Sequence, residues 1–284
     1  MGRPRPASLL LALLAAATLC LSLPSLGLAD PRRPTPSGAT RNPGVRRRPP
    51  ARPASASCGY ANRGSLDHGR ALRESASLRF LPGRTLHFGT DELVGLLERS
   101  ARGLHRRFRA RLTVGDLSAR CGGPAAQHRS HQSGRDADVA FFVRRVTRRG
   151  VGAPVELTDY VVFDGQGRNA DGTLAFDTAR NWAFIEAVLT DTQARAARVF
   201  VSSPLRALLL RWAREHGASP HVIELAANTL VQPARVSPHD NHFHVHRVPR
   251  GRRRVPRGRG APSTSRAATR AAPARRAPAR RSGR

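Results

Sequence analysis

The sequence contains no lysine, a single methionine and only 5% aromatic residues, although Lys and Arg together number 49. Every basic side chain other than histidine is therefore an arginine. The absence of lysine excludes enzymes whose serine nucleophile lies in an S-x-x-K motif. No H-E-x-x-H motif occurs either, which excludes the helical zinc site that this motif builds.

Acidic residues are scarce, and the resulting net charge of +30 is unevenly distributed. Residues 1–29, 30–56 and 247–284 carry +2, +6 and +14, which leaves +8 for residues 57–246. Both flanks are rich in Pro, Ala, Gly and Ser, so we expect 30–56 and 249–284 to be disordered. The tail is either a soluble low-complexity extension or an electrostatic attachment to an anionic envelope polymer. Neither flank has the interleaved aromatic residues of a single-strand nucleic-acid binder.

The N-terminus has the pattern of a secretory signal peptide over residues 1–29. Two arginines precede an apolar run from Leu9 to Leu23, and small residues lead to a predicted cleavage after Ala29. The run is too short to span a membrane stably. Cys20 would instead be a lipid attachment site in a lipoprotein, but the residues before it make a poor lipobox. We expect a periplasmic or secreted mature protein.

Cys58 and Cys121 remain after this processing. In an oxidising compartment two cysteines suggest one disulfide, and the alternative is a pair of unpaired buried thiols. Both lie outside the histidine motifs described below, which argues against a metal role.

Residues 57–248 are predicted to form one α+β domain, with a central, mainly antiparallel sheet flanked by helices. The predicted helices are Thr90 to about Arg109, Asp177 or Thr178 to about Arg195, and Ser203 to a residue before Gly217. The predicted strands are Ala137–Val143, a segment within Val155–Phe163, Arg198–Val201 and the segment around His242–His246. The third helix is predicted to bury Leu205, Leu208, Leu209 and Trp212. We expect the polar loop 165–172 to rim a cleft.

Two histidine motifs are the strongest functional signal in the chain. The first covers residues 131–138 and follows an H-x-x-G-x-x-x-D pattern. Gly134 allows a turn after His131, and Asp138 lies at the start of the strand that follows.

The second motif covers residues 239–244 and ends in H-x-H. We interpret it as a strand, because side chains that alternate at period two place His242, His244 and His246 on one face. Apolar residues then occupy the opposite face, as in a sheet whose one side forms the floor of a cleft.

Each motif alone is ambiguous, because a single loop histidine is usually just exposed to solvent. Their joint occurrence favours a metal site. If the two strands are neighbours, His131, Asp138 and His244 converge as two imidazoles and one carboxylate. Three protein ligands with one open position are typical of catalytic zinc.

The two motifs resemble the signature of the zinc metallopeptidases grouped with lysostaphin, the D-Ala-D-Ala peptidases and the hedgehog fold. In their longer forms, residues 128–134 and 239–244, they resemble the penicillin-insensitive murein endopeptidases of the MepA type. The resemblance covers about residues 58–247. It implies that His131, Asp138 and His244 bind zinc.

The same resemblance implies that His242 is a catalytic histidine beside the zinc, with His239 next to it and His128 as a further active-site imidazole. Some members of the group use Asp and His residues between the motifs for a second metal. Between Asp138 and Pro204 this chain has no histidine, so we expect one zinc ion per chain.

Zinc held by two neutral imidazoles and one carboxylate lowers the pKa of a bound water to roughly 7, and the hydroxide attacks an amide carbonyl. No glutamate flanks either motif, so His242 is the candidate for moving the proton. His239 either orients His242 or stabilises the oxyanion; otherwise it is a loop residue bonded to Asp240. Asp136 and Asp240 are candidates for fixing an imidazole tautomer.

The resemblance implies hydrolysis of D-alanyl-diaminopimelyl cross-links in peptidoglycan, and β-lactams should not inhibit it because no S-x-x-K serine exists. A zinc D,D- or L,D-carboxypeptidase with the same site is one alternative. The other is a non-catalytic protein that binds the cell wall or an anionic polymer. The additional imidazoles of His242 and His239 favour an enzyme, because a structural site would use a fourth ligand instead. We expect neither a nucleic-acid partner nor a membrane span.

Overall fold

The structure is a computed structural model that describes residues 52–234 and 237–248. The predicted signal peptide (1–29), nearly all of the linker (30–56) and the tail (249–284) lie outside the described residues. The described part has the predicted α+β architecture.

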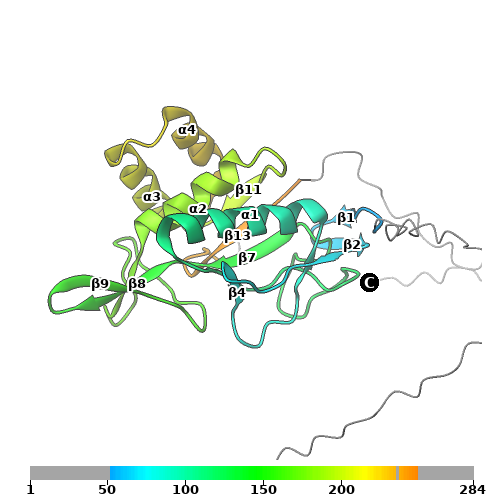
Figure 1. Cartoon of the computed structure of the whole chain (residues 1–284), viewed down its shortest axis with the longest axis horizontal. Coiled ribbons are helices and arrows are strands. Elements are labelled where there is room, and N and C mark those ends of the chain that lie inside the picture. The colour runs from blue at the N-terminus through cyan, green and yellow to red at the C-terminus, as the bar shows by residue number, and fades with distance from the viewer. Residues whose placement is uncertain (1–51, 235–236, 249–284) are drawn as a thin grey trace, which may run out of the picture. The chain divides into compact units, whose positions relative to one another are not determined.

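Four helices and thirteen short strands make up the described chain (Figure 1). The helices are α1 (Asp91–Phe108), α2 (Thr178–Thr190), α3 (Ser203–Glu215) and α4 (Pro220–Thr229). The strands of the first half are β1 (Ala56–Tyr60), β2 (Arg63–Asp67), β3 (Arg70–Ala71), β4 (Leu78–Phe80), β5 (Phe88–Gly89) and β6 (Leu112–Val114). The others are β7 (Asp136–Ala140), β8 (Val143–Thr147), β9 (Gly150–Val155), β10 (Leu174–Phe176), β11 (Arg198–Phe200), β12 (Leu230–Val231) and β13 (His242–His246).

A six-stranded sheet in the order β12-β11-β13-β7-β6-β4 forms the centre of the fold. Its inner pairings β11–β13, β13–β7 and β7–β6 are antiparallel, and only the two outer pairings are parallel. The predicted neighbourhood of the two histidine strands is confirmed, because His244 pairs with Asp138 across β13 and β7.

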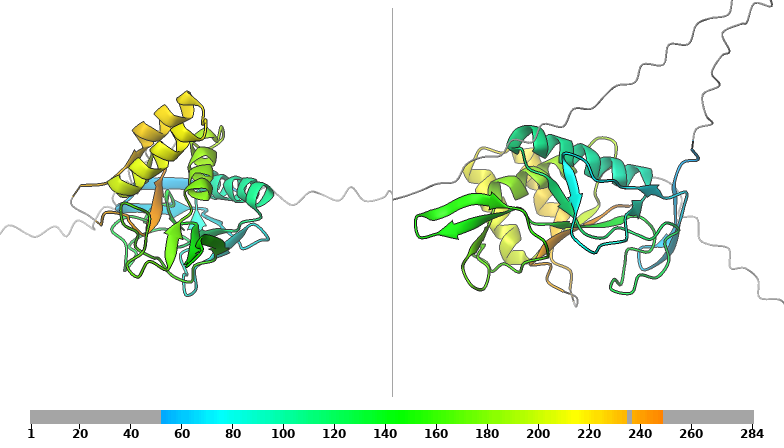
Figure 2. Two further views of the ribbon diagram at one scale, coloured as in Figure 1. Left: turned by 90° about the vertical axis from the view of Figure 1, so that its left-hand side faces the viewer. Right: turned by 60° about the horizontal axis from the view of Figure 1, so that its bottom comes forward.

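The helices cover one face of this sheet, as Figure 2 shows. α1 contacts β4 and β6, while α3 and α4 contact β12 at the other edge. Phe243 and Val245 are fully buried on this face, and the Phe243 ring lies 5.7 Å from that of Phe184 on α2. The alternating residues of β13 therefore present their imidazoles to the opposite, helix-free face.

The first helix begins as predicted. Thr90 has extended backbone angles, and its hydroxyl accepts the Leu93 N–H, as an N-cap residue does. The second helix is shorter than predicted and ends at Thr190. Asp191 causes this, because its Oδ1 accepts the N–H groups of Gln193 and Ala194 and turns the chain away.

The third helix has a buried face slightly different from the predicted one. Leu205, Leu209, Leu210 and Ala213 are buried, whereas Leu208 and Trp212 are partly buried at its margin. Residues 220–229, for which no helix was predicted, form α4 with proline in its first turn.

The strand predicted within Val155–Phe163 is wrong. β9 ends at Val155, and residues 156–163 follow an irregular path. The strand lies earlier, as the second arm of a β8–β9 hairpin that projects from the domain (Figure 1). The polar turn at residues 148–149 provides the reversal between its arms.

The expected Cys58–Cys121 disulfide is not formed. Cys58 pairs with Ser65 across β1 and β2, and Ser65 in turn bridges Gly122 on its other side. One strand therefore separates the two cysteines, which places their backbones about 9–10 Å apart, beyond the reach of a disulfide. The buried Cys58 thiol instead lies 3.5 Å from Asp67 Oδ2.

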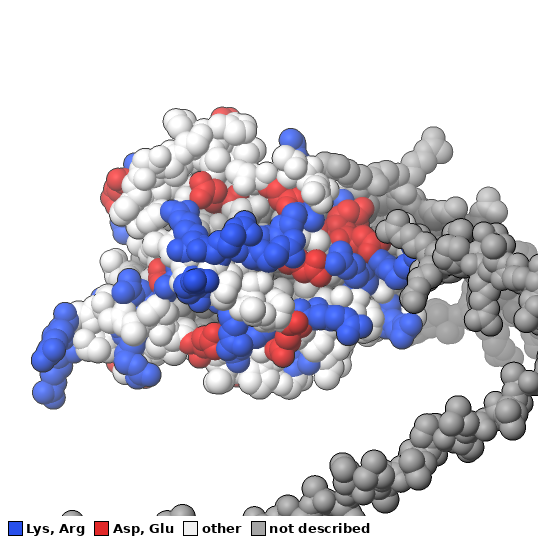
Figure 3. All heavy atoms as spheres, viewed as in Figure 1, with Lys and Arg blue, Asp and Glu red and all other residues white. Residues whose placement is uncertain are grey.

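One group of exposed arginines lies along α1. Arg102, Arg106 and Arg107 are exposed there, and Figure 3 shows a continuous basic band over this helix. None of the helices that the structure describes has the length and apolar character needed to cross a bilayer.

Candidate metal centre and catalytic cleft

A cleft of about 710 Å³ opens on the helix-free face of the central sheet. β7, β11 and β13 form its floor, and the 127–131 segment and Tyr160 contribute to its walls. All six site residues predicted from the sequence line it: His128, His131, Asp138, His239, His242 and His244. The loop 165–172 does not contribute to the lining; its Gly167 lies close to Leu208 of α3 instead.

The carboxylate of Asp138 lies among four imidazoles. His244 Nδ1 is 2.9 Å from Asp138 Oδ1, His131 Nε2 is 3.3 Å from it, and His242 Nε2 is 3.5 Å from it. His128 Nδ1 lies 3.7 Å from the second carboxylate oxygen. Side chains from β7, β13 and the loop before β7 thus meet at one point, as the motif spacing predicts.

His131 is held by its backbone and by its outer ring nitrogen. The residue has a left-handed φ of 66°, which is uncommon for a residue with a side chain. Its amide N–H donates to Asp136 Oδ2 at 3.3 Å, and the Ser118 hydroxyl donates to its carbonyl. Its Nδ1 donates to the Leu117 carbonyl at 2.6 Å, so Nε2 is the ring nitrogen that faces Asp138.

His244 is oriented by the second buried aspartate of the cleft. Its Nε2 donates to Asp136 Oδ1 at 3.0 Å, and the same oxygen accepts His246 Nδ1 at 2.7 Å. The predicted tautomer-fixing contact of Asp136 is therefore present. Asp240 instead uses its backbone carbonyl, which accepts the Phe163 N–H.

In the other two imidazoles of the second motif, one ring nitrogen likewise donates to an oxygen of the protein. His242 Nδ1 donates to Asn241 Oδ1 at 2.6 Å, and His239 Nδ1 donates to the Ser237 carbonyl at 2.8 Å. His239 thus bonds to Ser237 rather than to Asp240. In His242 the second nitrogen, Nε2, faces the cluster around Asp138.

Burial and charge shift the pKa values of the cluster in opposite directions. Burial alone would lower the pKa of His244, but the hydrogen bond to Asp136 and the negative charges of Asp138 and Asp136 outweigh it and raise the pKa to about 10. Burial would raise the pKa of Asp138, but the charge of His131 holds it well below its ordinary value. Burial, together with repulsion from His242 and His244 in their protonated forms, lowers the pKa of His239 to about 4.

These side chains suit a metal ion. Within residues 52–234 and 237–248, three groups bring their ligand atoms within 4.8 Å of one another: His128/His131/Asp138, His239/His242/His244 and Asp136/His244/His246. His131 Nε2 and Asp138 Oδ1 are buried and make no hydrogen bond. A buried polar atom without a partner is costly, and two such atoms that face each other fit two ligands of one cation.

The sequence motifs did not indicate several residues that line the cleft or lie beside it. Asp116 Oδ2 accepts His128 Nε2 at 3.1 Å and Arg84 at 3.0 Å, so it holds His128 beside Asp138. The Tyr160 ring lies 4.7 Å from that of His242. Gly115 permits this approach, because a Cβ there would lie 1.8 Å from the Tyr160 hydroxyl. The one sequence signal for Asp116 is a carboxylate two residues after the strand at residues 112–114.

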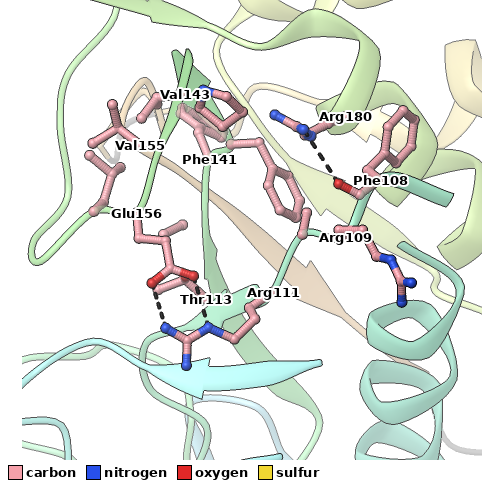
Figure 4. A pocket seen from close by; sticks show the side chains of 14 residues that line it. Phe108, Arg109, Arg111, Thr113, Phe141, Val143, Val155, Glu156 and Arg180 are labelled. Atoms are coloured by element: carbon pink, nitrogen blue, oxygen red, sulfur yellow. Dashed lines mark hydrogen bonds and ion pairs between the residues drawn. The ribbon is translucent and has the colours of Figure 1, made fainter. Parts of the chain in front are cut away.

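A second, smaller pocket of about 230 Å³ lies beside the β8–β9 hairpin (Figure 4). Its lining has no histidine, and Arg111 forms a two-pronged ion pair with Glu156. Apolar side chains such as Phe141 and Val143 line part of it. This pocket lacks the ligand chemistry of the cleft.

A cleft with buried imidazoles and carboxylates on the floor of a sheet defines the chain as an α+β protein with a candidate metal centre. Comparison with known families agrees. The family described as penicillin-insensitive murein endopeptidase matches residues 57–263, so the chain belongs to that family and is a peptidase of peptidoglycan. No curated protein matches the chain.

Proposed function

We propose that the chain is a zinc-dependent endopeptidase that hydrolyses the D-alanyl-diaminopimelyl amide of peptidoglycan cross-links. The observation that carries this proposal is the role of each ring nitrogen in the two ligand histidines. In His131 and His244 the outer nitrogen donates to a protein acceptor and the inner nitrogen faces Asp138. Metal-binding histidines have this arrangement, because the outer hydrogen bond fixes the tautomer that ligates.

His131, Asp138 and His244 would hold the zinc ion. Such an ion supplies a Lewis acid for the scissile carbonyl and lowers the pKa of a bound water to about 7. Two neutral imidazoles and one carboxylate leave it with a net positive charge, which favours both effects.

His242 has the position of the general base and acid. Its Nδ1 proton is committed to Asn241, so Nε2 presents a lone pair 3.5 Å from Asp138 Oδ1. This nitrogen takes a proton from the attacking water and returns it to the leaving amine. The pKa of His239 is lowered to about 4, and its Nδ1–H donates to the Ser237 carbonyl. A neutral ring whose N–H is already used has no proton to donate to an oxyanion. These contacts therefore favour a role in orienting His242 over a role in stabilising the oxyanion.

His128 is held in the cleft by Asp116 and faces the second oxygen of Asp138. We infer that the His128 ring stabilises the negative charge of the Asp138 carboxylate. The absence of lysine supports insensitivity to β-lactams, because the acylated S-x-x-K serine cannot be present. The leader pattern of residues 1–29 supports export to the periplasm or the exterior, where the substrate lies.

Digestion of purified cross-linked muropeptide dimers, with and without a zinc chelator, tests this function by mass spectrometry. We expect the dimers to become monomers, each cut adding one water, and we expect chelator to stop the reaction. His131→Ala and His244→Ala should lose zinc and activity together. His216→Ala, a change on the exposed end of α3, serves as the control that keeps both.

Other outcomes separate the alternatives. Release of terminal D-alanine from monomers, with dimers left intact, would identify a carboxypeptidase. Binding to sacculi without any cleavage would identify a non-catalytic wall protein. Cleavage that persists in His131→Ala and His244→Ala would refute the zinc mechanism.

A further inference from the structure

The cleft contains two arginines in addition to its imidazoles. Arg129 and Arg198 line it, and both are exposed. The carboxylates in the lining are the buried Asp136 and Asp138, which are already engaged by the imidazoles around them. The solvent-facing part of the cleft is therefore cationic, which suits an anionic substrate.

Arg198 occupies the better defined position of the two. It lies on β11, where it pairs with His246 while Phe200 pairs with His244. Residues paired across an antiparallel ladder share a face, so Arg198 stands on the same face as the ligand imidazole. The two-residue step from Phe200 to Arg198 is about 7 Å along the strand.

The guanidinium of Arg198 is available to a ligand. Within the described residues no ion pair or hydrogen bond engages it. The nearest carboxylate along the ladder is Asp136, whose Oδ1 accepts both His244 and His246 and whose Oδ2 accepts the His131 N–H. That carboxylate already accepts three hydrogen bonds, and it forms no ion pair with Arg198 among the described residues.

The substrate of the proposed reaction carries a matching charge. In a D-alanyl-diaminopimelyl cross-link, the carbon that bears the scissile nitrogen also bears a free carboxylate. We propose that Arg198 binds this carboxylate and so makes the enzyme specific for cross-links whose leaving amine is an amino acid with a free α-carboxylate. Guanidinium and carboxylate match in a two-pronged pair. This inference rests on the proposed function.

The test compares two synthetic dimers that differ at one group. One has the free carboxylate beside the scissile nitrogen, and the other has a carboxamide there. For the wild-type protein we expect kcat/KM to be roughly 10- to 100-fold higher for the carboxylate, the range of a charge-assisted pair. Arg198→Gln should reduce this preference to near unity, mainly through KM, and Arg198→Lys should restore part of it.

Arg195→Gln is the matched control. Arg195 is also an exposed arginine, three residues before Arg198, but it does not line the cleft. This variant should keep the full preference. A wild-type preference that survives in Arg198→Gln, or that disappears in Arg129→Gln instead, would overturn the assignment.

The proposed function fails in a different way. If the wild-type protein cleaves neither dimer, the endopeptidase activity itself is refuted. If it cleaves both at equal rates, the activity stands and only the role of Arg198 is refuted.

Discussion

Asp136→Asn should weaken zinc binding without unfolding the domain. The carboxylate of Asp136 accepts His244 Nε2 at 3.0 Å, His246 Nδ1 at 2.7 Å and the His131 N–H at 3.3 Å. It therefore supports two of the three proposed ligands. The asparagine has the same shape and keeps one carbonyl acceptor, but it loses the negative charge.

The magnitude follows from these contacts. Loss of a hydrogen-bond partner behind a ligand imidazole usually lowers metal affinity by roughly 10- to 100-fold. The charge of Asp136 also contributes to the raised pKa of His244, which is about 10 in the metal-free cluster. The variant should therefore release fewer protons when zinc binds, because ligand imidazoles must be neutral in the complex.

Asp116→Asn is the control. Asp116 is also buried and also accepts an imidazole N–H, at 3.1 Å, but its partner is His128, which is not a proposed ligand. Competition with a chromophoric chelator gives the zinc affinity of each variant, and circular dichroism shows that both are folded. A loss of affinity in Asp116→Asn with none in Asp136→Asn would refute the ligand assignment and favour the His128/His131/Asp138 group.

Three further changes test other parts of the site. His242→Ala should keep its zinc, measured by elemental analysis, but lose roughly 10²–10⁴-fold in kcat, and unchanged turnover would exclude general acid–base work. In chelator-treated protein the free energy of unfolding should fall as pH rises from about 6.5 to about 10. The reason is that the folded state favours the charged form of His244, whose pKa is raised to about 10. Urea titrations should show this decline, and zinc-loaded protein should lack it. Deletion of residues 250–284 should leave cleavage of soluble dimers intact and weaken binding to sacculi at low salt, whereas equal binding would assign no attachment role to the tail.

Elements with strong local signals could be predicted from the sequence. The Thr90 cap and the acidic first turn set the start of α1 independently of tertiary contacts. The alternation of His242 and His244 with Phe243 fixed both the strand and its two faces. In each case the determining interactions span only a few residues.

Features that depend on tertiary pairing could not be predicted in this way. Two cysteines suggested a disulfide, but the register of β1 and β2 places Ser65 between Cys58 and Cys121. Asp116 has no motif, and its role exists only because the chain brings His128 to it across twelve residues. Tyr160 reaches the cleft from a segment predicted to contain a strand, and no periodicity indicated its position.

The proposed roles of the histidines are supported by the groups that hold each ring. His131 and His244 are 1% and 6% exposed, and their outer nitrogens donate to a buried backbone carbonyl and to a buried carboxylate. Such a ring cannot turn without leaving a polar group unsatisfied. This fixed orientation is what a metal ligand requires. His242 is less buried, and its outer partner is the half-buried side chain of Asn241, which can move with it. A ring that must accept and release a proton in each turnover needs this freedom and this access to water. The hydrogen-bond partners and the burial of the two rings in the H-x-H motif therefore favour His244 as the ligand and His242 as the acid–base group.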